Sequence, residues 1–393
     1  MKRPIFLFVA RMDFGGQERF VSRLSEMLCD AYEVYVVLFD NRIMNYPVFG
    51  TVLNLDVGEL TSSIFKKVIK TLKRCKRLRG FLNQYRPIAC FSFGRESDFI
   101  NLLSKKCGIR VLTSIRGFAV AECMSKNHMD RILYPRSDKI ICVSKGIEMR
   151  IRQDFPNLKK KTALLYNAYD CEQIQSLAKA GIPPHFRGLS GPKLVSVGTL
   201  KPIKGYFHLI KAVWVLKHNY PTIHLSIVGE KSKEYGSRLQ ELINRLNLQT
   251  NVTLEGWNAN PYVFIAHSDF FVLSSVREGF PNALVEAMAC RKPVVAADCP
   301  TGPREILSHM SYDTAIHKIE CAEYGILVPP LSAEEDYSTT ILPEEKVLAE
   351  AIGLLLKNTS LQNEYSGKAY SRALEFSYEA CRSKVITLLD GTD

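Results

Sequence analysis

Residues 270–296 read FFVLSSVREGFPNALVEAMACRKPVVA. The apolar run at the start predicts a buried strand that ends at Ser274, and the apolar spacing after Pro281 predicts a helix. Proline is favoured in the first turn of a helix, because the N–H group that it lacks would have no partner there. A strand, a turn and a helix in this order form the repeating unit of a parallel α/β sheet, so the stretch indicates an α/β fold.

The turn and the helix start of this stretch carry groups that suit an anionic, hydroxyl-rich ligand. The N–H groups of residues 282–285 are expected to point out of the helix, where with the helix dipole they can bind a pyrophosphate. Glu278 in the turn and Glu286 in the helix can accept hydrogen bonds from sugar hydroxyls. Two glutamates alone also fit a strand–turn–helix that binds nothing, so the surrounding residues must decide.

With those surroundings, the stretch resembles the E-x7-E motif of the retaining glycosyltransferase family 4, which has the GT-B fold: two Rossmann-like domains whose parallel sheets face across a cleft. The resemblance implies that Glu278 contacts hydroxyls of the donor sugar and that Glu286 binds the nucleotide ribose. It also implies transfer with retention and without a metal or cofactor. The donor-binding residues that follow the first glutamate are then Gly279, Phe280, Asn282, Ala283, Leu284 and Val285.

A second segment, LVSVGTLKPIKGYFHLIKA at 194–212, reads as a strand, a glycine turn and a helix. It is similar to the G-R-L-x-x-x-K-G signature of the same family, whose Arg and Lys neutralise the donor diphosphate. Gly198 and Lys204 match, and Lys204 joins Glu278 as a predicted catalytic residue. Thr199 stands where the family has Arg, and Lys201 is a candidate substitute. A solvated lysine at the start of a helix is the alternative for Lys204.

Several segments in the first half of the chain also resemble the family, each with lower specificity. Gly15 and Gly16 follow the first predicted strand, and glycine there lets the backbone approach a phosphate closely; they resemble the family's G-G-x-E-R loop, so Gly16 is a predicted donor contact. Arg116 stands where many relatives carry a histidine, and it is a predicted catalytic residue or an ordinary surface arginine. Segments 137–146 and 165–168 also resemble parts of the family that line the cleft.

Strand-like apolar runs alternate with helix-period segments almost throughout, which is typical of parallel α/β sheets. Glycine and proline accumulate at 179–192, the best candidate for a linker. We therefore predict an N-terminal Rossmann-like, acceptor-binding domain at 1–185 and a C-terminal donor-binding domain at 186–375. A tail at 376–393 is expected to pack back on the N-terminal domain. The strands and helices predicted in the first half are Ile5–Ala10, Tyr32–Leu38, Ala89–Ser92, Val111–Ser114, Lys139–Val143, Ala163–Leu165, Glu18–Cys29 and Ser63–Gln84.

The composition is that of an ordinary folded protein, with 46% hydrophobic and 23% charged residues among 393. No apolar stretch is long enough for a transmembrane helix, and Arg11 and Asp13 follow the short apolar start too closely for a signal peptide. The eleven cysteines are scattered without a CxxC pair, which favours a reducing compartment, and the eight histidines lack metal-ligand spacing. We expect a cytoplasmic protein with no bound metal.

The net charge of +12 is confined to the first half of the chain: residues 1–185 hold 31 Lys and Arg against 17 Asp and Glu. Eight of these cations fall within 66–79, where Phe65, Val68, Ile69, Leu72, Cys75 and Leu78 form an apolar stripe at helical spacing. A basic amphipathic helix suits an anionic membrane. We expect the stripe to lie mostly in the core, with lipid-facing cations Lys66, Lys67, Lys70, Lys73, Arg74, Lys76 and Arg77.

No nucleic-acid-binding module accompanies the basic stretch, so the inner face of the cell membrane is the expected partner and nucleic acid is not. Together these features predict transfer of a hexose or N-acetylhexosamine from a nucleoside-diphosphate sugar, UDP-linked by preference, to a lipid-linked glycan in bacterial surface polysaccharide or oligosaccharide biosynthesis. Two alternatives stay open: a sugar-nucleotide epimerase of the same fold, and a non-catalytic membrane-bound partner of another transferase.

Overall fold

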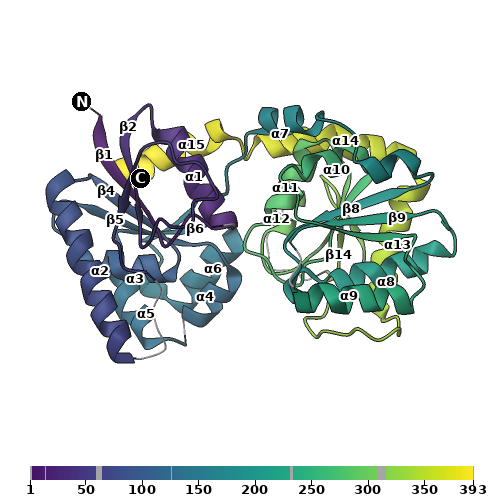
Figure 1. Cartoon of the computed structure of the whole chain (residues 1–393), viewed down its shortest axis with the longest axis horizontal. Coiled ribbons are helices and arrows are strands. Elements are labelled where there is room, and N and C mark those ends of the chain that lie inside the picture. The colour runs from purple at the N-terminus through teal and green to yellow at the C-terminus, as the bar shows by residue number, and fades with distance from the viewer. Residues whose placement is uncertain are drawn as a thin grey trace. The chain divides into compact units, whose positions relative to one another are not determined.

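A computed structural model describes residues 2–13, 15–58, 64–124, 126–230, 233–308 and 316–392. The chain divides into two compact units, and each has its own sheet (Figure 1). Unit 1 comprises residues 1–168 and 378–393, and unit 2 comprises residues 169–377. The predicted α/β class with two Rossmann-like domains is confirmed.

The sheet of unit 1 has the strand order β3-β2-β1-β4-β5-β6-β7 among the described residues, and every pair in it is parallel. Its strands are β1 (Arg3–Val9), β2 (Tyr32–Leu38), β3 (Thr51–Asn54), β4 (Ala89–Phe93), β5 (Arg110–Ile115), β6 (Lys139–Cys142) and β7 (Thr162–Leu164). Its helices are α1 (Gly16–Leu28), α2 (Ile64–Tyr85), α3 (Arg95–Ser104), α4 (Phe118–Met124), α5 (His128–Leu133), α6 (Lys145–Asp154) and α15 (Tyr378–Asp390).

Both faces of this sheet are covered, because successive side chains of a strand point to opposite faces. Ile5 and Leu7 of β1 pack with α1 and α15, whereas Phe6 and Phe8 pack with α2 and α3. This explains why the central strands are continuous apolar runs and could be located from the sequence. The short edge strand β3 was missed, because its four residues include two polar ones.

Unit 2 repeats the plan with the strand order β10-β9-β8-β11-β12-β14-β13, in which only the β13–β14 pair is antiparallel among the described strands. Its strands are β8 (Lys193–Val197), β9 (His224–Val228), β10 (Val252–Gly256), β11 (Phe270–Leu273), β12 (Val294–Ala297), β13 (Glu320–Cys321) and β14 (Ile326–Val328). Its helices are α7 (Cys171–Ala178), α8 (Tyr206–Lys217), α9 (Lys233–Arg245), α10 (Tyr262–His267), α11 (Asn282–Ala289), α12 (Pro303–Leu307), α13 (Pro343–Lys357) and α14 (Thr359–Leu374).

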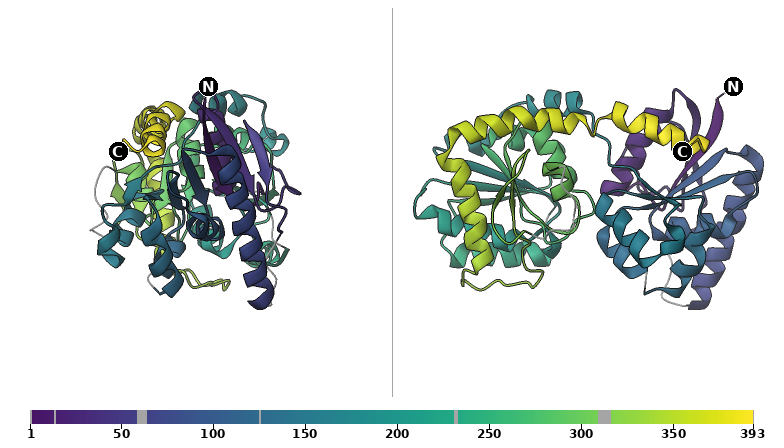
Figure 2. Two further views of the ribbon diagram at one scale, coloured as in Figure 1. Left: turned by 90° about the vertical axis from the view of Figure 1, so that its left-hand side faces the viewer. Right: turned by 180° about the vertical axis from the view of Figure 1, so that it is seen from behind.

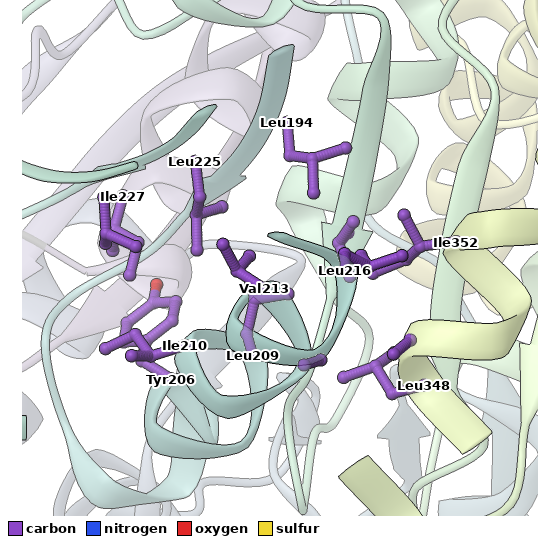
Figure 3. Packing of buried hydrophobic residues seen from close by; sticks show 14 of the residues in the cluster. Leu194, Tyr206, Leu209, Ile210, Val213, Leu216, Leu225, Ile227, Leu348 and Ile352 are labelled. Atoms are coloured by element: carbon purple, nitrogen blue, oxygen red, sulfur yellow. The ribbon is translucent and has the colours of Figure 1, made fainter. Parts of the chain in front are cut away.

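Helix α8 fills the centre of unit 2. Its residues Leu209 and Val213 lie between Leu225 of β9 and Leu348 of α13, all of them fully buried (Figure 3). Since α8 is apolar on nearly every side, it is held between the sheet and α13 rather than on the surface. This packing fixes the position of the first turn of α8. That turn follows Lys204, one of the predicted site residues.

The predicted domain boundary at 185/186 is wrong, because the chain changes units between Ala168 and Tyr169. Helix α7 belongs to unit 2, where Gln175 Nε2 donates to the carbonyl of Ala289 at 3.2 Å and Asn260 Nδ2 donates to the carbonyl of Leu177 at 2.8 Å. Residues 179–192 thus form a loop inside unit 2, with a short 3₁₀ helix at Pro184–Gly188. Glycine and proline mark a break in regular structure, and such a break need not separate domains.

The chain returns to unit 1 after Ser377, and α15 packs there against β1 and α1 (Figure 2). Val385 and Leu389 are buried in this contact. Asp390 accepts hydrogen bonds from Arg3 at 2.7 Å and from Tyr32 at 2.7 Å, so the last helix is tied to the first two strands. Unit 1 therefore contains residues from before and after unit 2, whereas unit 2 is one continuous segment of the chain.

Candidate active site

The candidate site of unit 2 lies at the point where the order of its strands reverses. The sheet grows outward from β8 in one direction and from β11 in the other. In open parallel sheets, ligands bind beside the carboxyl ends of the strands at such a point. Gly198 follows β8 and Glu278 follows β11, so the two segments singled out in the sequence meet at this location.

The central feature of the site is an ion pair between Lys204 and Glu278. Lys204 Nζ lies 2.7 Å from Glu278 Oε1, and their side chains are 23% and 12% exposed. Ser275 Oγ donates to the same carboxylate oxygen at 2.7 Å. The ammonium is therefore held at the edge of the sheet, partly shielded from water, and is not a freely solvated lysine.

The backbone brings Lys204 to this position through a short 3₁₀ helix, Pro202–Lys204, that ends at Gly205. Gly205 has φ of 60°, and a Cβ there would lie 2.1 Å from the carbonyl oxygen of Ser274. Only glycine fits this left-handed, crowded position. Ser274 Oγ also donates to the carbonyl of Lys204 at 2.9 Å, which joins the two segments directly.

The turn after β11 is fixed by the segment 300–302. Glu278 N donates to the carbonyl of Pro300 at 2.8 Å, and Thr301 N donates back to the carbonyl of Glu278 at 3.1 Å. Thr301 Oγ1 donates to the carbonyl of Gly279 at 2.8 Å. These bonds hold the backbone of the turn before any ligand is bound, as a preorganised site requires.

Helix α11 begins at Asn282, with Pro281 as the residue before its first turn. Asn282 Oδ1 accepts a hydrogen bond from Tyr169 Oη at 2.6 Å, and the ring of Phe280 packs edge-on against Phe376 at 5.3 Å. The start of the helix is therefore anchored on two sides. The side chain of Ala283 is half-buried beside this anchor.

Not all of the expected N–H donors of α11 face a ligand. Leu284 N donates to the carbonyl of Pro281 at 3.2 Å, and the side chains of Leu284 and Val285 are fully buried. The first turn closes tightly on itself, which satisfies Leu284 within the helix. Glu286 is 2% exposed in the same helix, so the predicted ribose contact is nearly enclosed by protein.

Gly198 is held at the end of β8 by close packing. Its N–H donates to the carbonyl of Val228 at 2.9 Å, and its carbonyl accepts from Tyr206 Oη at 2.9 Å. Burial, with a contribution from the Glu278 carboxylate, raises the pKa of Tyr206, so the phenol stays protonated and donates. Thr199 and Lys201 are exposed beside it, and it is Lys204 that pairs with Glu278.

The predicted residues of unit 1 lie at the carboxyl edge of its own sheet. Gly16 is the exposed first residue of α1, directly after β1 and its loop. Arg116 follows β5, where its guanidinium donates to Ser114 Oγ at 3.2 Å and to Asn167 Oδ1, and lies 3.8 Å from the centre of the Phe20 ring. Arg116 is therefore an anchored residue, and two of the weakly indicated segments meet through its contact with Asn167.

Unit 1 contains a cavity of about 420 Å³ at its own strand-reversal point, between β1 and β4. Arg11, Arg74 and Arg95 contribute cations to it, and the first turn of α3 forms one wall. The cavity was not predicted, because its lining comes from loops far apart in the sequence. It is lined by Ala10, Arg11, Gln17, Phe39, Asp40, Gly58, Arg74, Phe93, Gly94, Arg95, Glu96 and Ser97.

Arg74 faces this cavity and not a membrane, so its predicted lipid contact is wrong. The side chain is 2% exposed, because it donates to the carbonyls of Val57 and Gly58, pairs with Glu96 at 3.2 Å and lies over the Phe39 ring at 3.6 Å. Burial lowers the pKa of this guanidinium, although arginine remains charged in proteins. Arg74 anchors α2 to the rest of unit 1.

The apolar stripe of α2 is buried only in part, which also differs from the prediction. Cys75, Leu78 and Leu82 pack in the core, whereas the four apolar residues of the first turns are exposed. The helix extends beyond the sheet there, at the lower left of Figure 1, so those turns have no sheet to cover. The exposed fractions are 75% for Phe65, 52% for Val68, 37% for Ile69 and 64% for Leu72.

Some of the other cations of α2 face solvent, and others contact residues of unit 1. Lys66, Lys67, Lys73 and Lys76 are exposed, and Lys70 is half-buried. Arg77 is 48% exposed but lies 3.3 Å from Asp56, which ties it to the end of β3. Among the described residues, no helix combines the length and the apolar character that crossing a membrane requires.

Two Rossmann-like units, with a lysine–glutamate pair and a helix start at the carboxyl edge of the second, define a glycosyltransferase of the GT-B class. Residues 14–173 match the family Glycosyltransferase Family 4, and residues 184–372 match Glycosyl transferases group 1. The chain belongs to glycosyltransferase family 4. It is thus an enzyme of the transferase class.

Relatives of known sequence agree with this assignment. The chain is 34% identical over 269 residues to an uncharacterized glycosyltransferase of Methanocaldococcus jannaschii, a match that covers 67% of this chain and just under two thirds (66%) of the relative. It is 28% identical, over 94% of both chains, to the N-acetylgalactosamine-N,N'-diacetylbacillosaminyl-diphospho-undecaprenol 4-alpha-N-acetylgalactosaminyltransferase of Campylobacter jejuni.

Solved structures agree with the fold. HepE of Anabaena in complex with UDP superimposes with a TM-score of 0.76 at 19% identity, over 100% of both chains. Sucrose-phosphate synthase of Thermosynechococcus elongatus superimposes with a TM-score of 0.75 at 20% identity, over 100% of this chain and 99% of that one. At these identities the likeness establishes the fold alone.

Proposed function

We propose that this glycosyltransferase moves a hexose or N-acetylhexosamine from a UDP-sugar to a lipid-linked glycan at a membrane surface, with retention at the anomeric carbon and without a metal in the reaction. The observation that carries the proposal is the Lys204–Glu278 pair at the strand-reversal point of unit 2, 2.7 Å between charged atoms.

The donor half is supported by two kinds of charge at one edge of the sheet. The Lys204 ammonium and the positive end of the α11 dipole suit a diphosphate, whose negative charge grows as the sugar bond breaks. The carboxylate of Glu278 suits hydroxyl donors of the sugar. When the diphosphate enters, it competes with Glu278 for the ammonium, which frees carboxylate lone pairs for the sugar.

The acceptor half is supported by the cavity of unit 1. Three arginines and the start of α3 suit a phosphate group, and Asp40 and Glu96 suit hydroxyls of a glycan. The Campylobacter jejuni relative, matched over 94% of both chains, is named for a diphospho-undecaprenol-linked acceptor. An acceptor that combines a diphosphate with sugars fits both observations.

The membrane surface is supported by α2. Its exposed apolar residues alternate with exposed lysines over the first turns, which is the pattern of a helix that lies in the interface of an anionic bilayer. Arg74 joins this helix to the cavity wall. A lipid-linked acceptor held at the bilayer would thus present its diphosphate beside the cavity while its chain stays in the lipid.

The donor is tested by a thermal-shift screen against UDP, GDP, ADP and CMP and their sugars, because a ligand that binds only the folded state raises its melting temperature. The UDP series is expected to give the largest shift. The same screen on Glu278→Gln separates the contribution of the nucleotide to binding from that of the sugar. UDP should still raise the melting temperature of the variant, whereas the additional rise from the sugar should be smaller. No shift with any nucleotide would contradict the donor assignment.

Transfer is tested with the preferred UDP-sugars and a polyprenyl-diphosphate-linked oligosaccharide in mixed micelles. The product's anomeric coupling, measured by NMR, reports retention. Glu278→Gln should lose turnover while its circular dichroism is unchanged, and addition of EDTA should leave turnover intact. Conversion of a UDP-sugar with no acceptor present would instead support an epimerase.

A further inference from the structure

A polar cluster lies on the face of the unit 2 sheet that looks away from α8. Along β9 and β10 the apolar residues Leu225, Ile227, Val252 and Leu254 belong to the core around α8. Since alternate residues of a strand point to opposite faces, His224 and Ser226 of β9 and Thr253 and Glu255 of β10 share the other face. His185, from the 3₁₀ helix that precedes β8, covers them.

The geometry of this cluster brings three metal-binding groups together. His185 Nε2 lies 2.9 Å from Glu255 Oε1 and 3.4 Å from Ser226 Oγ. One ligand atom from each of His185, His224 and Glu255 lies within 4.8 Å of the others. With metal–ligand distances of about 2.0–2.1 Å, ligand atoms around a tetrahedral zinc are about 3.3 Å apart. Small side-chain rotations are therefore enough to bring the three ligand atoms to the spacing that zinc requires.

His224 is already oriented as a ligand. Its Nδ1 lies 3.2 Å from the carbonyl oxygen of Thr250, which can only accept, so Nδ1 carries the proton. Its Nε2 then has a free lone pair and lies 3.1 Å from Thr253 Oγ1, a hydroxyl that can donate to it or give way. A metal-binding histidine usually has this arrangement, with its second ring nitrogen fixed by a backbone carbonyl.

We propose that His185, His224 and Glu255 form a Zn²⁺ site that fastens the loop between α7 and β8 to the edge of the unit 2 sheet. Two imidazoles and one carboxylate suit zinc, whereas Mg²⁺ and Ca²⁺ prefer oxygen ligands alone. His185 is 34% exposed on its side chain, so an ion can enter from solvent and keep a water as its fourth ligand. The three ligands are far apart in the sequence, so spacing rules could not find them.

The role of this ion is structural. The ligands lie on β9, β10 and the preceding loop, and none of them belongs to the Lys204–Glu278 pair or the turn after β11. Strand β10 is the last strand at its end of the sheet, and an ion that links it to the loop protects that edge. Zinc should therefore raise thermal stability and leave turnover per folded molecule unchanged.

The test begins with the whole protein, stripped with a chelator and dialysed. Zinc binding is measured by calorimetry and by elemental analysis of the dialysed protein, and thermal unfolding is recorded with and without ZnCl₂. We expect one equivalent of zinc and a rise of about 5 °C at a hundredfold excess over the dissociation constant. The variants are His185→Ala, His224→Ala and Glu255→Gln, with His267→Ala in α10 of the same unit as the matched control.

Each ligand variant should lose both the bound equivalent of zinc and the zinc-dependent rise in melting temperature. His267→Ala should keep both. His185→Ala is the decisive variant, since its partly exposed loop position tolerates truncation even if the buried His224→Ala fails to fold. The absorption spectrum of the Co²⁺-loaded protein should lack thiolate-to-metal charge transfer, which excludes binding to the exposed cysteines Cys107, Cys123 and Cys321. Binding that survives His185→Ala, or no zinc-dependent shift in the unchanged protein, would overturn the proposal.

Discussion

Lys204 Nζ lies 2.7 Å from Glu278 Oε1, although the two residues are 74 positions apart in the chain. The same carboxylate oxygen accepts from Ser275 Oγ, so it serves two donors at once. An ion pair this close restricts the long lysine side chain to one orientation. Less conformational entropy of that side chain is then lost when a ligand binds to it. In the proposed donor site, the cation expected to bind the diphosphate is thus positioned by the carboxylate expected to bind the sugar.

The first prediction concerns the loss of that cation. Lys204→Ala should lower kcat by about 10²- to 10³-fold, because it removes an oriented charge that stabilises the departing diphosphate. Lys201→Ala is the matched control: it is exposed directly before the 3₁₀ helix begins and should keep near-normal turnover. Steady-state kinetics with a UDP-sugar measure both variants.

The pair also predicts how the two substitutions combine. If Lys204 and Glu278 act as one unit, the double variant Lys204→Ala with Glu278→Gln should lose less than the product of the two single losses. Fully multiplicative losses would mean that the two side chains act separately, and the ion pair would then be incidental to the reaction.

Much of the candidate donor site could be predicted, because most of its signals are local. The strand, turn and helix around Glu278 follow from an apolar run, a glycine and a proline within one short segment, and β11 and α11 begin where that pattern places them or within one residue. Gly205 differs, because the crowding that requires glycine there comes from the carbonyl of Ser274 in the other segment. The match of Lys204 to the second family signature then predicted the cation that the structure places beside Glu278.

What could not be predicted depends on contacts between distant segments. Thr301 and Tyr169 hold the site together, but nothing in their own neighbourhoods marks them. The same holds for Arg74, whose position within a run of cations suggested contact with lipid headgroups, while the carbonyls and the Phe39 ring that bury it come from other loops. Position in a helix stripe indicates which face a residue is on and leaves open how far the neighbouring sheet extends.

The second prediction concerns Gly205. Gly205→Ala should destabilise the protein by about 1–3 kcal/mol, since φ of 60° is unfavourable for alanine and its Cβ would clash with the Ser274 carbonyl. Gly367→Ala in α14 is the matched control: its Cβ meets nothing within 4 Å, and alanine in a helix should stabilise by about 0.5–1 kcal/mol. Urea unfolding measures both, and equal effects would contradict the stated role of Gly205.

The third prediction concerns the exposed turns of α2. Replacing Lys66, Lys67 and Lys73 by glutamine should weaken binding to phosphatidylglycerol-containing vesicles by about a hundredfold, at about 1 kcal/mol for each cation. Phe65→Ser with Leu72→Ser should weaken it by at least about tenfold through lost apolar contact. Leu354→Ser, an exposed leucine of α13 in unit 2, is the control. Vesicle sedimentation in which all variants bind alike would refute the role of α2.

The last prediction concerns Asp98, a fully buried residue of α3. Burial raises the pKa of its carboxyl from 3.8 to about 8, even though Ser92 and Tyr134 donate to it at 2.7 and 3.0 Å. Between about pH 4 and pH 8 the folded protein therefore keeps a proton that the unfolded chain releases. Stability must fall as pH rises through this window, by up to about 1.4 kcal/mol per pH unit from this group.

Asp98→Asn should remove that contribution, because an amide cannot release the proton at any pH in the range. The melting temperature of the variant should decline less than that of the unchanged protein between pH 5 and pH 8, even if the amide costs some stability at pH 5. Asp138→Asn is the control, since this aspartate is only half-buried and pairs with Lys105 at 2.6 Å. If Asp98→Asn and the unchanged protein lost stability in parallel across the window, Asp98 would have to be ionised in the folded state.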